Sequence, residues 1–267
     1  MSPLRRRQVL GVVAGIVAAG LCAVAWSQAK SYTQSMNTFL YGDDISEPSE
    51  FQFTRLAYQS NGGRGFGRRS RWLTDWPEAE EHLLGGIHRL TRIDAAERGR
   101  AVSVMEDDLF DRPWLYAVEV GSWYLDDMEA ARLREYLLRG GFLMVDDFHG
   151  SFEWAGFLAT LQRVFPDRSV VDVPETDPVM RILYELDERT QIPGMAALSS
   201  GTTYERDGNV PYWRGVYDDK GRLMVMINFN MDLGDAWEHA NTPWYPEEFT
   251  ALAYRFAINY TLYAMTH

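Results

Sequence analysis

Two groups of polar side chains follow apolar runs that predict buried strands. Asp146, Asp147 and His149 come directly after the run at 142–145. The second group lies at and after the end of the run at 222–229 and consists of Asn228, Asn230, Asp232, Asp235, Glu238 and His239. Ligands of open parallel sheets bind beyond the carboxyl ends of the strands. If these two strands are neighbours, the carboxylates and imidazoles meet at one edge of the sheet.

Such a meeting of side chains indicates two kinds of chemistry. Oxygen ligands with one or two histidines suit a divalent metal such as magnesium, manganese, calcium or zinc, and a bound metal can activate water for hydrolysis. Alternatively, two neighbouring carboxyl groups with separated pKa values can act as acid and base. The candidate catalytic residues are Asp146, Asp147 and His149. The candidate ligand-binding residues are Ser122, Asp232, Asp235, Trp237 and Glu238.

The same residues also have purely structural interpretations. Asp147 or Ser151 can cap the helix that follows, and Asp232 can cap a short helix in DLGDAWE. Trp237 can pack in the core instead of stacking on a sugar ring. Adjacent residues of a strand point to opposite faces, so Asp146 and Asp147 reach one ligand only if the strand has already ended.

The elements that position these residues alternate between strand and helix. Strands are expected at 51–58, 114–120, 142–145 and 170–173. Helices are expected after Pro77, after an Asp126 and Glu129 capping box, and from a Ser151 cap to Pro166. This order predicts an α/β fold with a mostly parallel central sheet and flanking helices on its faces.

The later part of the chain has a different pattern. Strands at 212–217 and 222–229 flank Asp218-Asp219-Lys220-Gly221, which predicts an antiparallel hairpin. A long helix that starts near Pro246 completes the domain.

The first residues have the features of an export signal. Arg5, Arg6 and Arg7 precede an uncharged stretch at 9–26, and small residues follow it. We therefore expect a twin-arginine-like signal or membrane anchor at 1–29, a linker at 30–50 and one domain at 51–267. The protein is expected in the periplasm or cell envelope, attached to the membrane only through the first segment if that segment is not cleaved.

Composition excludes several classes of function. The single cysteine lies inside the expected signal, so the exported chain has no disulfide, no cysteine ligand and no cysteine nucleophile. The net charge of −12 opposes nucleic-acid binding. Cations, neutral sugars, peptides or an envelope protein are the expected partners. The Gly- and Arg-rich segment at 61–71 lacks both phosphate-binding motifs and is interpreted as a loop.

Four blocks in order carry a resemblance to a known family: FQFTRLAY, DWPEAEEHLLGGIHRLTRI, YLDDMEAARLREYLLRGGFLMVDDFHGSF and DLGDAWE. Over nearly all of residues 51–265 the chain resembles the bacterial domain-of-unknown-function family 4159. That family is similar to the class I glutamine amidotransferase-like superfamily, so the resemblance implies a flavodoxin-like three-layer sandwich. The exported chain lacks the cysteine of those amidotransferases, which excludes their mechanism.

Three functions remain open. The first is an envelope module that binds a ligand or protein on an amidotransferase-like fold without its nucleophile. The second is a metal-assisted or carboxylate-dependent hydrolase of an envelope carbohydrate or peptide, which requires the two acidic groups to meet. The third is a structural partner in a membrane complex, for which a broad exposed aromatic patch is expected.

Overall fold

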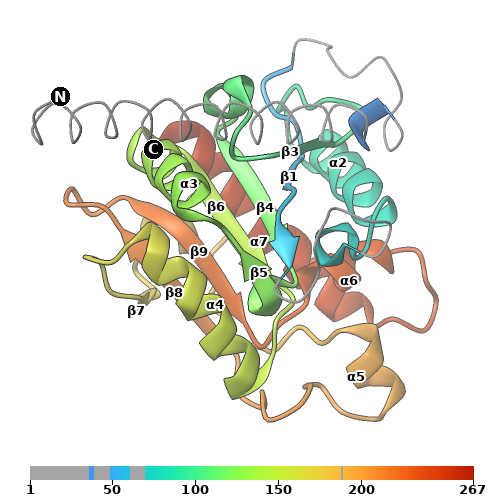
Figure 1. Ribbon diagram of the computed structural model, residues 1–267. Coiled ribbons are helices and arrows are strands. Elements are labelled where there is room, and N and C mark those ends of the chain that lie inside the picture. Colours follow the sequence, from blue (N-terminus) through green and yellow to red (C-terminus); the bar gives the residue numbers. More distant parts are fainter. Residues whose placement is uncertain (1–35, 39–48, 61–69, 188) are drawn as a thin grey trace, which may run out of the picture.

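The computed structural model describes residues 36–38, 49–60, 70–187 and 189–267, with a central sheet covered by helices on both faces (Figure 1). The strand order is β3-β1-β4-β6-β9-β8-β7. Five strands are parallel: β1 (Thr54–Leu56), β3 (Arg100–Val102), β4 (Trp114–Val118), β6 (Phe142–Asp146) and β9 (Leu223–Phe229). The predicted α/β sandwich with a mostly parallel sheet is therefore confirmed.

The other edge of the sheet is antiparallel. β8 (Tyr212–Tyr217) pairs with β9, and β7 (Val171–Asp172) pairs with β8. The predicted hairpin is therefore confirmed. The strand expected at 170–173 is shorter, and its pairing is antiparallel rather than parallel. Because β8 runs opposite to β9, β7 has the direction of β6 and still meets an antiparallel neighbour.

Helices form the two outer layers. On one face lie α2 (Glu78–Leu90), α6 (Leu233–Glu238) and α7 (Glu247–Thr266), and on the other lie α3 (Asp127–Leu138) and α4 (Gly150–Val164) (Figure 1). Shorter elements are η1 (Arg71–Leu73), β2 (Gln59–Ser60), η2 (Asp107–Asp111), η3 (Val120–Ser122), β5 (Trp123–Tyr124), η4 (Pro178–Met180) and α5 (Met195–Ser199). All residues of β4, β6 and β9 are buried, as expected for strands covered on both faces.

The N-terminal ends of α3 and α4 test the helix caps that the sequence predicts. Asp126 Oδ1 accepts hydrogen bonds from the backbone N–H groups of Met128 and Glu129, both at 2.9 Å, and Glu129 completes the predicted capping box. The Ser151 cap is wrong, because α4 begins at Gly150. Distant side chains accept the first N–H groups of α4, Asn230 from Gly150 at 2.8 Å and Asp207 from Ser151 at 2.9 Å.

Several predictions concern residues outside the described ranges. These are the export signal at 1–29, most of the linker at 30–50, and the loop at 61–69. Within the linker, Asn37 is buried and exchanges hydrogen bonds of 2.6 and 2.8 Å with Ala101 of β3, which a free linker would not do. Across the described ranges, every helix is too short or too polar to cross a membrane.

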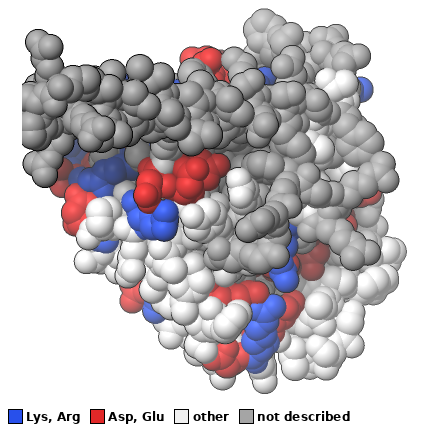
Figure 2. Space-filling model, viewed as in Figure 1, with Lys and Arg blue, Asp and Glu red and all other residues white. Residues whose placement is uncertain are grey.

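The surface over α3 and α4 carries charges of both signs next to one another (Figure 2). Arg134 pairs with Asp167 at 2.7 Å, and Arg163 pairs with Asp127 at 2.6 Å. Exposed pairs of this kind contribute little to stability. Substitutions in them are therefore suitable controls for substitutions of buried charges.

Candidate functional site

The carboxyl ends of three neighbouring parallel strands carry strained polar residues. Glu119 follows β4, Asp147 follows β6 and Asn230 follows β9, with φ angles of 56°, 51° and 63°. A left-handed conformation costs a non-glycine residue about 1–2 kcal/mol, and such strain concentrates at functional sites. The other described non-glycine residues with positive φ are Asp75 and Arg206. Both lie at the same rim, as their contacts below show.

Backbone hydrogen bonds join the segments that follow these strands. β6 and β9 are paired, and beyond them the N–H of Asp147 donates to the carbonyl of Met231 at 3.2 Å. The N–H of Asn230 donates to the carbonyl of Phe148 at 3.1 Å. The two polar groups seen in the sequence therefore meet at one rim. Because β6 ends at Asp146, the alternation that would separate Asp146 from Asp147 does not continue.

Asp146 connects the end of β6 to the start of α6 through hydrogen bonds. Its Oδ2 accepts the backbone N–H groups of Leu233 and Gly234 at 2.8 and 2.9 Å, and the hydroxyl of Tyr116 at 3.3 Å. Burial raises the pKa of Asp146 to about 7, although these hydrogen bonds favour the charged form. Asp146 is thus a positioning residue for the helix that carries Asp232, Asp235 and Glu238.

Three further carboxylates form the inner carboxylate cluster, which we define as Asp75, Asp147 and Asp232. One oxygen from each lies within 4.8 Å of the others. Asp232 is the N-cap of α6 and accepts the N–H of Asp235 at 2.8 Å. Asp75 Oδ2 lies 2.2 Å from the place where a Cβ on Gly234 would be, so only glycine allows this approach.

The inner cluster places negative charge where little water can screen it. Burial raises the pKa of Asp75, Asp147 and Asp232 well above the usual value, and the neighbouring carboxylates raise each of them further. Arg55 lowers the pKa of Asp75, but its Nε already donates to Glu80 at 2.5 Å. Without a cation, the cluster therefore holds protons at a pH where ordinary carboxyl groups have lost them.

This proton binding predicts an unusual pH dependence of stability. Carboxyl groups with a raised folded pKa stabilise the fold fully below the unfolded value near 3.8, and the contribution is lost as pH rises through the folded value, about 7 for Asp146. His149, whose pKa is lowered from 6.5, acts in the opposite direction as a single group. In EDTA, Tm should therefore fall from pH 5 to pH 8, by about 2–4 °C for each kcal/mol lost. A Tm in EDTA that rises across this range would contradict the assigned protonation.

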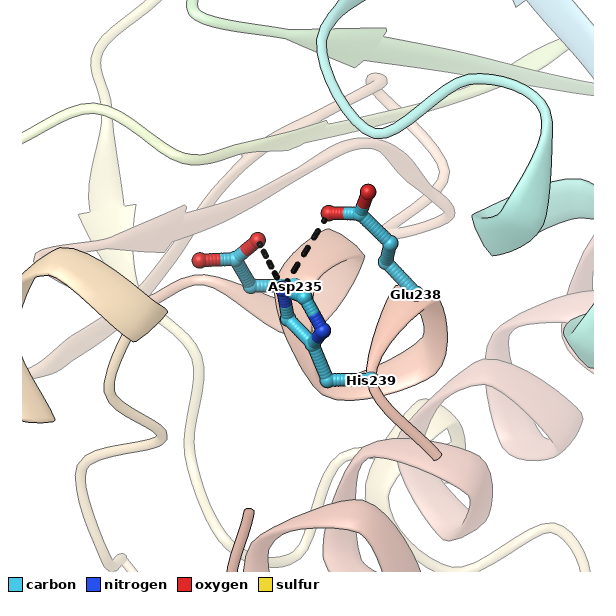
Figure 3. A group of neighbouring side chains, drawn as sticks. All are labelled: Asp235, Glu238 and His239. Carbon is cyan, nitrogen blue, oxygen red and sulfur yellow. Dashed lines mark ion pairs between the residues drawn. The ribbon is translucent and has the colours of Figure 1, made fainter. Parts of the chain in front are cut away.

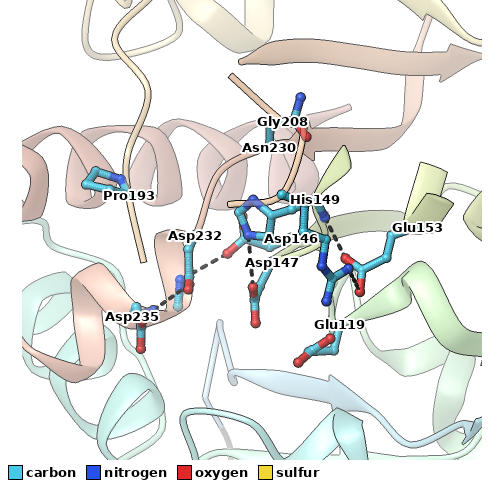
Figure 4. A network of polar contacts seen from close by, with 12 residues as sticks. Glu119, Asp146, Asp147, His149, Glu153, Pro193, Gly208, Asn230, Asp232 and Asp235 are labelled. Atoms are coloured by element: carbon cyan, nitrogen blue, oxygen red, sulfur yellow. Dashed lines mark hydrogen bonds and ion pairs between the residues drawn. The ribbon is translucent and has the colours of Figure 1, made fainter. Parts of the chain in front are cut away.

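His149 lies beside the inner cluster (Figure 4). Its Nε2 is 3.2 Å from Asp147 Oδ1, and its backbone N–H donates to Glu153 Oε2 at 2.6 Å. Glu153 also forms an ion pair with Arg206, which brings that strained residue to the rim. Burial lowers the pKa of His149, although neighbouring carboxylates oppose the change. The imidazole is therefore neutral at pH 7 and can accept a proton.

A second group lies nearer the surface, and we call Asp235, Glu238 and His239 the outer acidic group (Figure 3). His239 Nε2 is 3.7 Å from Asp235 and 3.4 Å from Glu238. Burial and Asp235 raise the pKa of Glu238 to about 7. One oxygen of Asp235 is already engaged, because Oδ2 accepts the N–H of Met195 at 2.6 Å.

Two predicted ligand-binding residues lie apart from both groups. Trp237 has 0% of its surface exposed and packs against Phe53 and Tyr116, as its structural interpretation as a core residue expects. α6 presents this side chain to the core that it shares with α2 and α7. Ser122 is half-buried at the end of η3 and belongs to neither carboxylate group.

Sequence reasoning missed Asp75 and Glu119. Glu119 directly follows the apolar run at 114–118, so the argument that selected Asp147 applies to it as well. It was assigned to the strand instead, which ends one residue earlier. Asp75 has no such signal, because the packing of η1 and α2 places it at the rim.

Comparison with protein-family models gives a match over most of the chain. A protein-family model described as "Domain of unknown function (DUF4159)" matches residues 52–265. Among curated proteins, none matches the chain. All the cluster residues described above lie inside the matched range.

Proposed function

The chain belongs to domain-of-unknown-function family 4159, and we propose that it binds a divalent cation in the inner carboxylate cluster. The observation that carries this proposal is the approach of Asp75, Asp147 and Asp232, with one oxygen of each within 4.8 Å of the others. Oxygens bound to one ion lie at most about twice the metal–oxygen distance apart. This limit is about 4.2 Å for magnesium and about 5 Å for calcium. The 4.8 Å bound therefore fits ligands of one calcium ion, and the smaller magnesium ion requires the oxygens to lie closer together.

Unpartnered buried atoms at the rim support the proposal. Asp75 Oδ2, Asp146 Oδ1 and His149 Nδ1 are buried and have no hydrogen-bond partner among the described residues. Each buried unsatisfied polar atom costs about 1–3 kcal/mol. A cation with its bound water would satisfy these atoms. Because the donors are mainly carboxylate oxygens, magnesium, manganese and calcium are favoured over zinc.

With the cation bound, we propose that the rim is the ligand-binding centre of an exported cell-envelope module. The cation would supply positive charge at an otherwise acidic surface and recruit a ligand through its oxygen atoms. The proposed relation to the amidotransferase-like superfamily concerns the fold alone, since the expected exported chain has no cysteine nucleophile.

One observation favours a second candidate, a metal-assisted hydrolase. The neutral His149 imidazole is 3.2 Å from Asp147, a proposed ligand, and can take a proton from water held near the cation. The envelope carbohydrate or peptide expected as its substrate is part of the same proposal.

Isothermal titration of the EDTA-treated, dialysed full chain with Mg²⁺, Mn²⁺ and Ca²⁺ tests the binding proposal. We expect saturable binding of one equivalent of at least one ion, with at least a tenfold loss of affinity in Asp232→Asn. Asp127→Asn is the matched control, because Asp127 is exposed and pairs with Arg163 on α4. Absence of binding by all three ions would overturn the proposal, as would unchanged affinity in Asp232→Asn.

A further inference from the structure

A pocket of about 690 Å³ lies between α2, α7 and the loop that follows α6. Its lining includes His82, Gly85, Asn241, Thr242, Tyr245 and Tyr254, and excludes the inner carboxylate cluster. The cation proposal does not use this pocket.

Gly85 gives the first indication that the pocket has an occupant. Glycine inside a helix is destabilising relative to alanine, and α2 has two in succession. Gly86 has a packing reason, because a Cβ there would lie 2.2 Å from the Tyr254 ring. Gly85 has none, because a Cβ there would meet nothing within 4 Å. Gly85 lines the pocket, and a side chain there would have open space around it.

The lining residues indicate the chemistry of the occupant. The Asn241 amide and the Thr242 hydroxyl provide hydrogen-bond donors and acceptors. His82 Nδ1 contacts the carbonyl oxygen of Trp237 at 2.8 Å, and Asn241 lies 3.3 Å from His82 Nε2, so both side chains are held in place. Tyr245 and Tyr254 add aromatic surface.

The loop that lines the pocket also carries an exposed indole, which is not itself a lining residue. Trp244 has 64% of its surface exposed, and both of its chain neighbours, Pro243 and Tyr245, line the pocket. Its ring lies beside the His239 ring, with centroids 6.3 Å apart and an interplanar angle of 29°. An amphipathic ligand with an apolar face and a polar edge fits an aromatic ring beside hydrogen-bonding groups.

The charges of the lining residues disfavour an anionic occupant. Two carboxylates, Glu81 and Glu247, line the pocket against one guanidinium, Arg89. The outer acidic group precedes the same loop. A neutral ring with hydroxyl groups satisfies the amide, hydroxyl and aromatic surfaces without adding charge.

We propose that this pocket binds a neutral saccharide, with Trp244 stacked on the sugar ring, Asn241 and Thr242 hydrogen-bonded to its hydroxyl groups, and Gly85 leaving room for it. The proposal does not depend on the cation site, so its test is made in EDTA.

Saturation-transfer NMR and isothermal titration of the full chain in EDTA test it with glucose, N-acetylglucosamine and their β-1,4-linked disaccharides. We expect one or more of these to bind, with affinity at least tenfold lower in both Gly85→Leu and Trp244→Ala. Gly85→Leu should unfold no more easily than the wild type, because leucine is a better helix former. The matched control is Phe152→Ala, because Phe152 is an exposed aromatic residue on α4 at 85% exposure.

Three results would overturn the saccharide proposal. They are absence of binding by every probe, an affinity in both pocket variants equal to that of the wild type, and binding that requires added Mg²⁺, Mn²⁺ or Ca²⁺. The last result would assign the sugar to the cation site. Cation titration without EDTA is a separate measurement, so failure of one proposal leaves the other to be judged by its own result.

Discussion

Replacement of Arg55 by methionine should lower the free energy of unfolding by about 3–5 kcal/mol. Arg55 and Glu80 form an ion pair of 2.5 Å with 0% and 1% of their side-chain surfaces exposed. Removal of the guanidinium breaks this buried ion pair and takes the Arg55 charge away from the Glu80 carboxylate. Urea denaturation in EDTA at pH 7 measures the loss.

Two further variants make this prediction specific. Arg163→Met breaks the exposed pair with Asp127 and should cost no more than about 1 kcal/mol. Glu80→Gln added to Arg55→Met should recover part of the loss, because it removes the buried carboxylate charge that the broken ion pair leaves. Equal losses in Arg55→Met and Arg163→Met would contradict the buried ion pair.

Arg55 also connects the core to the proposed site. Its guanidinium donates to the carbonyl oxygens of Trp72 and Thr74 at 2.9 and 2.8 Å, in the segment that leads to Asp75. The same residue lowers the pKa of Asp75. Loss of Arg55 should therefore weaken cation binding as well as the fold, although Arg55 is not a proposed ligand.

Replacement of Asp147 by asparagine should have effects of opposite sign on stability with and without a cation. Asp147→Asn should stabilise the protein in EDTA at pH 8, because the amide removes one of three crowded carboxylates. The expected gain is about 0.5–2 kcal/mol. The same substitution should abolish stabilisation by the cation, which for the wild type is about 2.7 kcal/mol at a concentration one hundred times Kd.

Urea denaturation at pH 8, in EDTA and with excess Mn²⁺, measures both effects. Asp127→Asn should change neither value by more than a few tenths of a kcal/mol, because Asp127 is exposed on α3. An Asp147→Asn variant that is destabilised in EDTA and stabilised by Mn²⁺ as much as the wild type would assign Asp147 a structural role.

Local signals predicted much of the fold because their partners lie close in the chain. The apolar runs of β4, β6 and β9 indicated strands covered on both faces, and Asp126 with Glu129 marked the start of α3. The start of α4 was misplaced because Asn230 and Asp207, which accept its first N–H groups, are 80 and 56 residues from their donors.

The site was predicted only where strand ends define it. Asp147 and Asp232 follow adjacent parallel strands. The sequence therefore predicted that they lie close together, on the single condition that the two strands are neighbours. Asp75 depends on tertiary contacts, because the buried Arg55 holds the backbone just before it. The core position of Trp237 could not be chosen over ligand binding, because the sequence of α6 does not show which of its faces meets α2.

Anomalous diffraction from crystals of the EDTA-treated protein soaked in Mn²⁺ tests the central claim most directly. We expect one strong peak bounded by Asp75, Asp147 and Asp232, with oxygen distances of roughly 2.0–2.6 Å. A peak confined to Asp235, Glu238 and His239, or no peak at the rim, would contradict a cation centre in the inner carboxylate cluster.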